Sequence, residues 1–156
     1  YEHSVTLRIT PGPQQNVFGN EAPTTLTGTT YTVSPQSDRM GYRLAGSKLV
    51  RKGPAEFVSD GTSMGALQVP SDGQPILLMA DRQTTGGYPK IAVVISVDLP
   101  FAAQLAPGDR IAFAPCTVAH AHTLLRAHRA QLDADLPPCD SRSQLIPPLN
   151  HRHESF

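Results

Sequence analysis

The sequence has no excess of charge of either sign. Its 156 residues include 13 Lys and Arg and 13 Asp and Glu, so the formal net charge is zero. Proteins that grip the phosphates of a nucleic acid need a basic patch or stripe, and this chain has none. The charge balance therefore argues against a nucleic-acid partner.

Long apolar runs are also lacking. No run approaches the roughly 20 residues that cross a bilayer, and the first residues lack the basic and apolar regions of a signal peptide. We therefore expect a protein without a membrane segment. The first residue is not Met, which suggests a processed chain or a fragment of a longer protein.

Cysteine is scarce, with only Cys116 and Cys139 in the chain. Two cysteines do not make a disulfide framework in a chain of this length, so a reducing cytoplasm is the simpler context and a cytoplasmic protein is expected. A helix of about 18 residues between them would rise roughly 27 Å, whereas bridged Cα atoms lie within about 7 Å. We therefore expect no disulfide between the two.

Short strands separated by turns dominate the first 115 residues. Val5, Leu7 and Ile9 alternate with polar residues, which is typical of a half-buried strand. Further strands are expected at residues 31–34, 37–44, 65–69, 74–79, 91–97 and 110–114. Pro70 presets a turn and Gly73 accepts a positive φ, so residues 65–79 should form a β-hairpin.

Few helices are expected. A helical turn is predicted near residues 21–26, and Asp98 can cap a short helix over residues 101–105. Thr117 is a reasonable N-cap for an amphipathic helix, whose apolar side carries Val118, Ala121, Leu124, Leu125 and Leu132. The pattern predicts an all-β barrel over residues 1–115, a C-terminal helix over residues 116–136 and a tail over residues 137–156.

The loop at residues 81–90 is the candidate active surface. Seven of its ten residues can donate or accept side-chain hydrogen bonds, and Gly86 and Gly87 let the backbone approach a ligand. Two simpler interpretations stay open. Asp81 can be a turn-forming aspartate at a strand end, and Thr84 to Gly87 can be a hairpin turn that needs positive φ.

Two arginines flank a glycine in the preceding part of the chain. Strand alternation puts Arg39, Gly41 and Arg43 on one face, where two guanidinium groups could hold a carboxylate or a phosphate. The alternative is that both arginines pair with structural acids such as Asp38.

Several long motifs together resemble one known family. They are Ser37-Asp-Arg-Met-Gly-Tyr-Arg-Leu-Ala-Gly46, Gly65-Ala-Leu-Gln-Val-Pro70 and Gly73-Gln-Pro-Ile-Leu-Leu-Met-Ala-Asp-Arg-Gln-Thr-Thr-Gly-Gly-Tyr-Pro-Lys-Ile-Ala92. They are similar, in this order, to the KipA-like family, also called allophanate hydrolase subunit 2 or the biotin-dependent carboxyltransferase family. The family includes the C subunit of bacterial 5-oxoprolinase. The resemblance runs from about Thr6 to Phe113.

The resemblance implies a fold and a set of partners. In the family this pattern belongs to the C-terminal half of a longer chain, which is a cyclophilin-like closed β-barrel with short helices. The expected partners are therefore the chain's own N-terminal half and a KipI-like protein, the B subunit of 5-oxoprolinase. An isolated C-terminal half is expected to be inactive.

The resemblance implies three possible functions. The first is ATP-dependent activation and hydrolysis of 5-oxoproline to glutamate, with ATP bound in the complex and not necessarily by this lobe. The second is carboxyl transfer from carboxybiotin to urea, the only case in which biotin is expected. The third is a non-catalytic regulatory module that binds a KipI-like kinase inhibitor.

Both enzyme reactions need groups that stabilise a small planar amide as charge develops on it. In this hypothesis Arg39 and Arg43 bind an anionic group of the ligand, and Asp81 polarises the amide or transfers a proton. The reacting amide is contacted by Gln68, Gln83, Thr84, Thr85 and the Gly86 and Gly87 backbone amides, and Tyr88 closes one wall. Asp81 and Gln83 are the catalytic candidates.

Two further functions are not supported by the residues. His120 and His122 point about 200° apart on the last predicted helix, and His128 lies two turns from His120, so no shared zinc site is expected. Prolyl isomerase activity would rest on analogy to the barrel fold alone.

Overall fold

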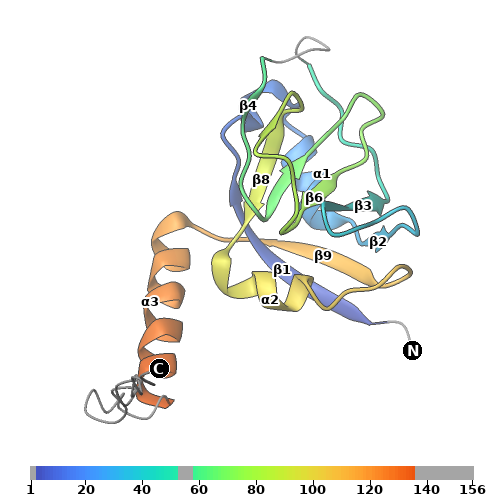
Figure 1. The fold of residues 1–156 in the computed structure, drawn as a ribbon. Coiled ribbons are helices and arrows are strands. Elements are labelled where there is room, and N and C mark those ends of the chain that lie inside the picture. Colours follow the sequence, from blue (N-terminus) through green and yellow to red (C-terminus); the bar gives the residue numbers. More distant parts are fainter. Residues whose placement is uncertain (1–2, 53–57, 136–156) are drawn as a thin grey trace, which may run out of the picture.

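The computed structural model describes residues 3–52 and 58–135. Its centre is a closed barrel with the strand order β1-β8-β5-β6-β3-β2-β9 (Figure 1). The barrel strands are β1 (Ser4–Pro11), β2 (Tyr31–Val33), β3 (Gly41–Ala45), β5 (Ala66–Gln68), β6 (Ile76–Leu78), β8 (Lys90–Val94) and β9 (Arg110–Pro115). The predicted all-β barrel is therefore confirmed.

The first and the last strand of the barrel lie side by side. β1 and β9 run parallel and pair from Ser4 with Arg110 to Ile9 with Pro115. β1 also pairs with β8 in antiparallel register. This closure leaves neither strand as an unpaired edge.

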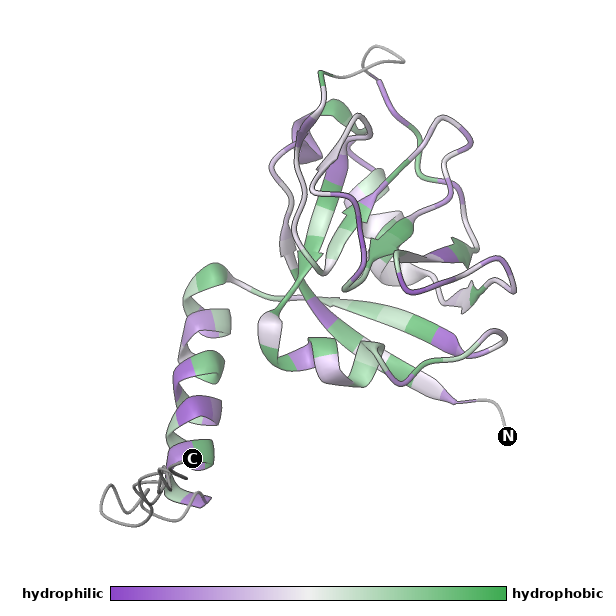
Figure 2. Ribbon diagram, in the orientation of Figure 1, coloured by the Kyte–Doolittle hydropathy of each residue, from purple (hydrophilic) through white to green (hydrophobic). Residues whose placement is uncertain are grey.

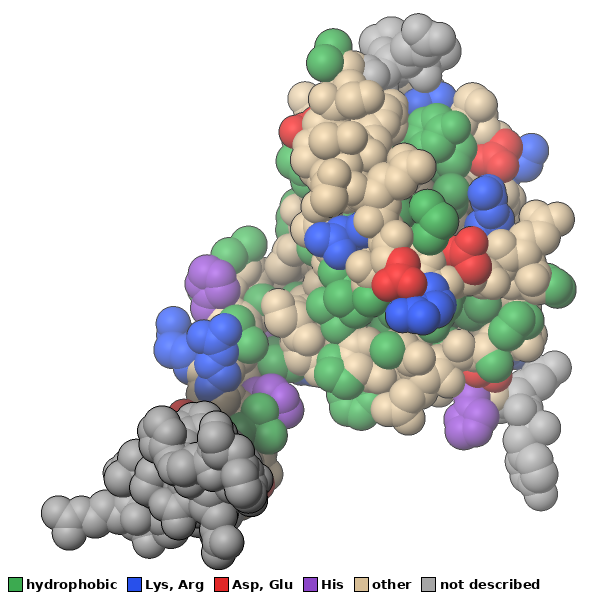
Figure 3. Space-filling model, in the orientation of Figure 1, with side chains coloured by type: hydrophobic (Ala, Val, Ile, Leu, Met, Phe, Trp, Pro, Cys, Tyr) green, Lys and Arg blue, Asp and Glu red, His purple; other side chains and the backbone are tan. Residues whose placement is uncertain are grey.

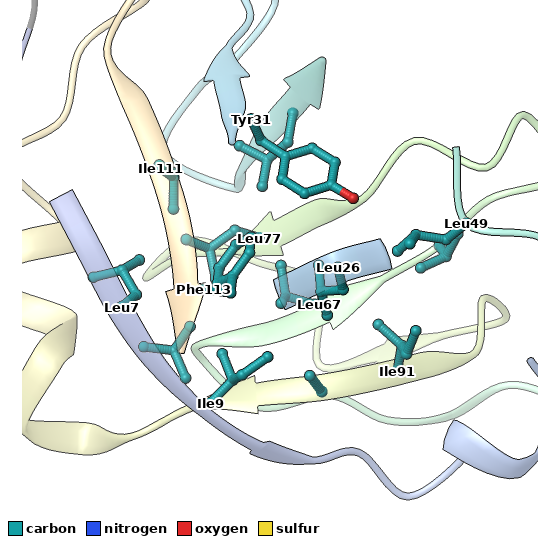
Figure 4. Close-up of a cluster of buried hydrophobic side chains, with 14 of the residues drawn as sticks. Leu7, Ile9, Leu26, Tyr31, Leu49, Leu67, Leu77, Ile91, Ile111 and Phe113 are labelled. Carbon is teal, nitrogen blue, oxygen red and sulfur yellow. The ribbon is translucent and has the colours of Figure 1, made fainter. Parts of the chain in front are cut away.

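The barrel interior is filled by apolar side chains (Figure 4). The aromatic rings of Tyr31 and Phe113 pack at a centroid distance of 5.9 Å. The Tyr31 hydroxyl donates a hydrogen bond of 3.1 Å to the Ser47 carbonyl, and burial raises the pKa of Tyr31 to about 12. Because the interior is packed, a ligand site has to lie outside the barrel wall.

Two short helices add to the core. α1 (Ala22–Gly28) buries Ala22 and Leu26 in the barrel, where the predicted helical turn lies. α2 (Leu99–Ala102) buries Ala102 and follows a 3-10 turn, η2 (Ser96–Asp98). The strand predicted for residues 91–97 therefore ends at Val94, because the chain turns into η2.

The predicted capping role of Asp98 is wrong. Its side chain makes no cap hydrogen bond, although Asp98 occupies the N-cap position of α2. The carboxylate instead accepts hydrogen bonds from the backbone N–H and the Nε of Arg8, at 2.7 and 2.9 Å. A guanidinium from β1 competes better for a buried carboxylate than neutral helix N–H groups do.

The predicted hairpin is present. β5 and β6 pair through Leu67 with Leu77 and Gln68 with Ile76. Gly73 has a φ of 81°, and its N–H donates to the Pro70 carbonyl at 3.1 Å, as expected for this turn.

The last described helix, α3 (Val118–Asp135), extends away from the barrel (Figure 1). Hydrophobic and hydrophilic residues alternate along the helix (Figure 2), and none of its residues is fully buried. The apolar side predicted for this helix is therefore only partly covered by the described part of the chain: Ala121, Leu124 and Leu125 are half-buried, whereas Val118 and Leu132 are exposed. Cys139 and the predicted tail, residues 137–156, lie outside the described residues. No helix within residues 3–52 and 58–135 has the length and apolar character needed to cross a membrane.

Candidate functional site

A cavity of about 580 Å³ lies on the outer side of the barrel wall. Core residues such as Leu44, Leu67 and Leu77 point inward from β3, β5 and β6, so their neighbours in these strands face outward. The outward-facing residues Gly41, Arg43, Gln68, Ile76 and Leu78 form the floor of the cavity, which Asp38, Met40, Thr62, Arg82, Gln83, Thr85, Gly86, Gly87 and Tyr88 surround.

A two-stranded ribbon borders the cavity. It consists of β4 (Asp60–Gly61) and β7 (Thr85–Gly86), which pair Asp60 with Gly86 and Gly61 with Thr85. Thr62 extends the pairing, because its N–H donates to the Thr84 carbonyl at 2.9 Å and its hydroxyl donates to the Gln83 carbonyl. We call this pair the β4–β7 ribbon. It fixes the backbone of the polar loop that the sequence singles out.

An ion pair with a buried lysine joins the ribbon to the barrel. The Lys90 Nζ donates to Asp60 Oδ2 and to the Gly61 carbonyl, both at 2.9 Å. The Lys90 side chain is 4% exposed and that of Asp60 is 60% exposed. Hydrogen bonds from Lys90, the Gly61 N–H and Gln14 hold the pKa of the Asp60 carboxyl below its usual value. We call this pair the Lys90 latch.

Gly86 is required by close packing and not by a left-handed backbone. The described glycines with positive φ are Gly65, Gly73 and Gly108, so Gly86 does not support the interpretation as a positive-φ turn. A Cβ at Gly86 would lie 2.7 Å from the Gln68 Nε2. Gln68 is buried and donates to the Tyr88 carbonyl at 3.4 Å. The missing side chain thus lets the ribbon approach the Gln68 amide.

Seven of the ten residues predicted for the site line the cavity. They are Arg43, Gln68, Gln83, Thr85, Gly86, Gly87 and Tyr88. Arg39, Asp81 and Thr84 are not among the lining residues. The polar loop, the hairpin and β3 thus meet in one place although they are separate segments of the sequence.

Arg39 and Asp81 pair with each other at the surface. The distance from Arg39 Nε to Asp81 Oδ2 is 3.0 Å, and both side chains are exposed. Asp38, the acid considered as a partner of the arginines, instead accepts hydrogen bonds from the Met40 and Gly41 N–H groups at 2.8 and 3.1 Å. Arg39 therefore pairs with an acid, as the alternative interpretation expected, but the acid is Asp81 and not Asp38.

Five residues that line the cavity were not predicted from the sequence: Thr62, Met40, Ile76, Leu78 and Arg82. Arg82 lies between two candidate residues, Asp81 and Gln83, and this position in the loop could have identified it as a site residue. Thr62 had no local signal, because its contacts are with a distant segment of the chain, Gln83 and Thr84. The apolar three form a hydrophobic patch beside the polar loop.

Charged groups of both signs lie next to each other on the barrel in the view of Figure 3, and no single-sign patch dominates it. His120, His122 and His128 are all exposed on α3. Among residues 3–52 and 58–135, no group of three or more His, Cys, Asp and Glu side chains is placed to hold a metal ion.

Comparison with known proteins identifies the fold family. Residues 1–115 match the family described as the carboxyltransferase domain, subdomain A and B. The chain belongs to this family. The cavity described above lies within the region that this carboxyltransferase-domain family matches.

Similar proteins carry two different names. The chain is 42% identical over 127 residues to the C subunit of 5-oxoprolinase from Haemophilus influenzae, a match that covers 81% of this chain and 41% of that protein. It is 43% identical over 115 residues to the C subunit of 5-oxoprolinase from Escherichia coli, with coverage of 74% and 37%. The urea carboxylase structure of Kluyveromyces lactis is 26% identical, with a TM-score of 0.79 over 86% of this chain and 13% of that one. The chain thus spans about two-fifths of the length of the 5-oxoprolinase proteins that it matches.

Proposed function

We propose that this chain is the barrel lobe of a protein like the C subunit of 5-oxoprolinase. In this proposal it works with its N-terminal half and a KipI-like partner in the cytoplasm, in the ATP-dependent activation and hydrolysis of 5-oxoproline to glutamate. The observation that carries the proposal is the cavity, which gathers two glutamine amides and the Gly86–Gly87 backbone beside a hydrophobic patch. The identity of more than 40% to proteins of that name supports the choice of substrate.

The cavity has the chemistry that a planar amide requires. A glutamine amide can donate to the carbonyl oxygen of a lactam and accept from its N–H. Gln68 is buried and its amide donates to the Tyr88 carbonyl, so in this proposal its dipole needs little rearrangement as charge develops on the lactam. Gln83 is more exposed than Gln68, and its backbone carbonyl accepts a hydrogen bond from the Thr62 hydroxyl. We therefore assign Gln68 and Gln83 to the reacting amide.

Asp81 acts in this proposal by holding the loop. Its side chain pairs with Arg39, and its backbone N–H donates to the Arg39 carbonyl at 3.0 Å. Both contacts join the start of the loop to the segment before β3. We therefore expect Asp81→Ala to weaken substrate binding less than a change at Gln83 does.

Replacing Gln83 tests this function in the full-length protein assembled with its partner subunits. We expect Gln83→Ala to lower 5-oxoproline-dependent ADP release on the order of 10²-fold, the usual effect of removing one donor to a developing oxyanion. Gln131→Ala, on the exposed surface of α3, is the matched control and should leave the rate unchanged. Full turnover in Gln83→Ala and in Gln68→Ala, or no 5-oxoproline-dependent ADP release by the unmodified complex, would contradict the proposal.

Carboxyl transfer from carboxybiotin to urea is the second candidate. The similarity to the Kluyveromyces lactis urea carboxylase favours it, because it covers more of this chain than the match to either 5-oxoprolinase protein. The same cavity would then hold urea, and a biotin carrier would have to reach it. Transfer of the carboxyl group from carboxybiotin to the urea nitrogen, leaving free biotin, in place of 5-oxoproline-dependent ADP release, would select this alternative.

A further inference from the structure

Two arginines line the cavity without an acidic partner in the described part of the chain. Arg43 comes from β3 and Arg82 from the turn that follows β6. The ion pairs among residues 3–52 and 58–135 are Arg8 with Asp98, Arg39 with Asp81, and Lys90 with Asp60. Two cations near the site, Arg39 and Lys90, are therefore neutralised, whereas the two guanidinium groups that line the cavity are not.

Arg82 has an unmet hydrogen-bonding requirement. Its Nε is buried and has no hydrogen-bond partner among the described residues. Buried polar groups in native proteins are nearly always paired, and an exception needs a reason such as an absent ion or ligand. Arg82 thus lines the cavity with a hydrogen-bonding requirement that the described residues leave unmet.

The one described acid that lines the cavity is already engaged by its own turn. Asp38 Oδ1 accepts the N–H groups of Met40 and Gly41, at 2.8 and 3.1 Å. These bonds fix the entry to β3 and direct the carboxylate at the backbone. Two arginines against one engaged aspartate leave the cavity positively charged, so it favours an anionic ligand.

We propose that Arg82, together with Arg43, binds a carboxylate carried by the amide ligand. A guanidinium presents donors in a planar fork that matches a carboxylate in bidentate geometry. The inference rests on the proposed function for the amide part of the ligand and adds a ligand class, a small amide or lactam with a carboxylate on a neighbouring carbon. Arg39, predicted for this task, is engaged by Asp81 at the surface and does not line the cavity. A neutral amide such as urea would leave both arginines of the cavity unpaired.

The test compares a charged and a neutral lactam. Full-length protein assembled with its partner subunits is titrated calorimetrically with 5-oxoproline and with 2-pyrrolidinone, which has the same ring without the carboxylate. We expect Arg82→Gln to weaken 5-oxoproline binding on the order of 10- to 100-fold, the size expected when a charge-assisted hydrogen bond is lost. Binding of 2-pyrrolidinone should stay the same. Arg43→Gln should act in the same direction, and Arg82→Lys should recover part of the loss because it restores the charge without the fork.

The control is Arg126→Gln, an exposed arginine on α3, which should bind both lactams like the unmodified complex. An equal loss of affinity for both lactams in Arg82→Gln would mean general damage to the cavity and would overturn the proposal. Unchanged binding of 5-oxoproline would overturn it as well. The proposed function would stand in either case if 5-oxoproline-dependent ADP release by the unmodified complex persists.

The anion site can also be tested if the unmodified complex proves inactive on 5-oxoproline. Acetate and acetamide then serve as probes in ligand-observed NMR on the full-length protein. We expect a signal for acetate that disappears in Arg82→Gln and persists in Arg126→Gln. Equal signals for both probes, or an acetate signal that survives Arg82→Gln, would show that these arginines do not select a carboxylate.

Discussion

Two ion pairs lie at opposite ends of the barrel. In one the acidic side chain is buried, and in the other the basic side chain is buried. At the α2 end the buried group is the acid, because the Asp98 side chain is 3% exposed and that of Arg8 is 35% exposed. At the site end the buried group is the base, because the Lys90 side chain is buried and that of its partner Asp60 is exposed. β4 and α2 lie at opposite ends of the barrel (Figure 1).

The two ion pairs connect different parts of the structure. Arg8 and Asp98 join β1 to η2, both of which contribute to or adjoin the core, so this pair supports the fold. The Lys90 latch joins the barrel to the β4–β7 ribbon, which contributes the Gln83 to Tyr88 side of the cavity. We infer that the α2 end governs stability and the site end governs ligand binding.

The largest effect on stability is expected from Arg8→Met. It leaves the Asp98 carboxylate buried with one remaining donor, the residue 8 backbone N–H. We expect the free energy of unfolding to fall by about 2 to 3 kcal/mol, somewhat less than for a fully buried pair because Arg8 is partly exposed. Denaturant unfolding of the full-length protein measures it. The double variant Arg8→Met, Asp98→Asn should recover part of the loss, and a double variant as unstable as the single one would refute this assignment.

Gly86→Ala should affect binding more than stability. The added Cβ would approach the Gln68 Nε2 to 2.7 Å, so the ribbon or the glutamine has to shift. We expect substrate affinity to drop by at least about tenfold, while the free energy of unfolding changes by less than about 1 kcal/mol. Calorimetry and denaturant unfolding measure the two quantities.

Gly28→Ala is the matched control, because a Cβ at Gly28 meets no described atom within 4 Å. It should bind substrate normally. Equal substrate affinity in Gly86→Ala and in this control would show that the close approach of the ribbon to Gln68 does not matter for binding. It would contradict the inference that the site end of the barrel governs ligand binding.

The smallest effect is expected from pH. The latch holds the pKa of Asp60 below its usual value near 4, so its contribution is present above that value and is lost as the pH falls through the lowered pKa. We expect the hydrogen-exchange protection factor of the Thr62 N–H, which donates to Thr84, to fall in this acidic range. The Ile95 N–H, which donates to the Arg8 carbonyl at the α2 end, should keep its protection longer. An equally steep fall for Thr62 in Asp60→Asn would disprove the role of the latch.

Local patterns predicted most of the barrel. Alternation at Val5, Leu7 and Ile9 identified β1, and the turn residues Pro70 and Gly73 identified the β5–β6 hairpin. These signals work because side-chain period and turn chemistry are set by neighbouring residues. The family motifs added the polar loop, most of which does line the cavity.

Long-range contacts could not be predicted in the same way. β4 and β7 are too short to show a strand pattern, and they pair although they are far apart in the sequence. Ion-pair partners depend on which segments the closed barrel brings together. The pairing of Arg8 with Asp98, and of Lys90 with Asp60, could therefore not be predicted from local sequence. Arg39 and Arg43 looked equivalent on a strand, but β3 begins only at Gly41, which leaves Arg39 free to reach Asp81.

The parallel pairing of β1 with β9 also bears on how the chain acquires its structure. β1 depends on β8 and β9 for its neighbours, and these are the last two strands of the barrel to be synthesised. Contacts between such distant segments slow folding, because a long loop has to close before they form. During synthesis one edge of β1 therefore stays unpaired until β8 has emerged, and the other until Pro115 at the end of β9 has left the ribosome. A chain cut short before Arg110 would keep the polar loop and most of the core residues, yet it could not close the barrel.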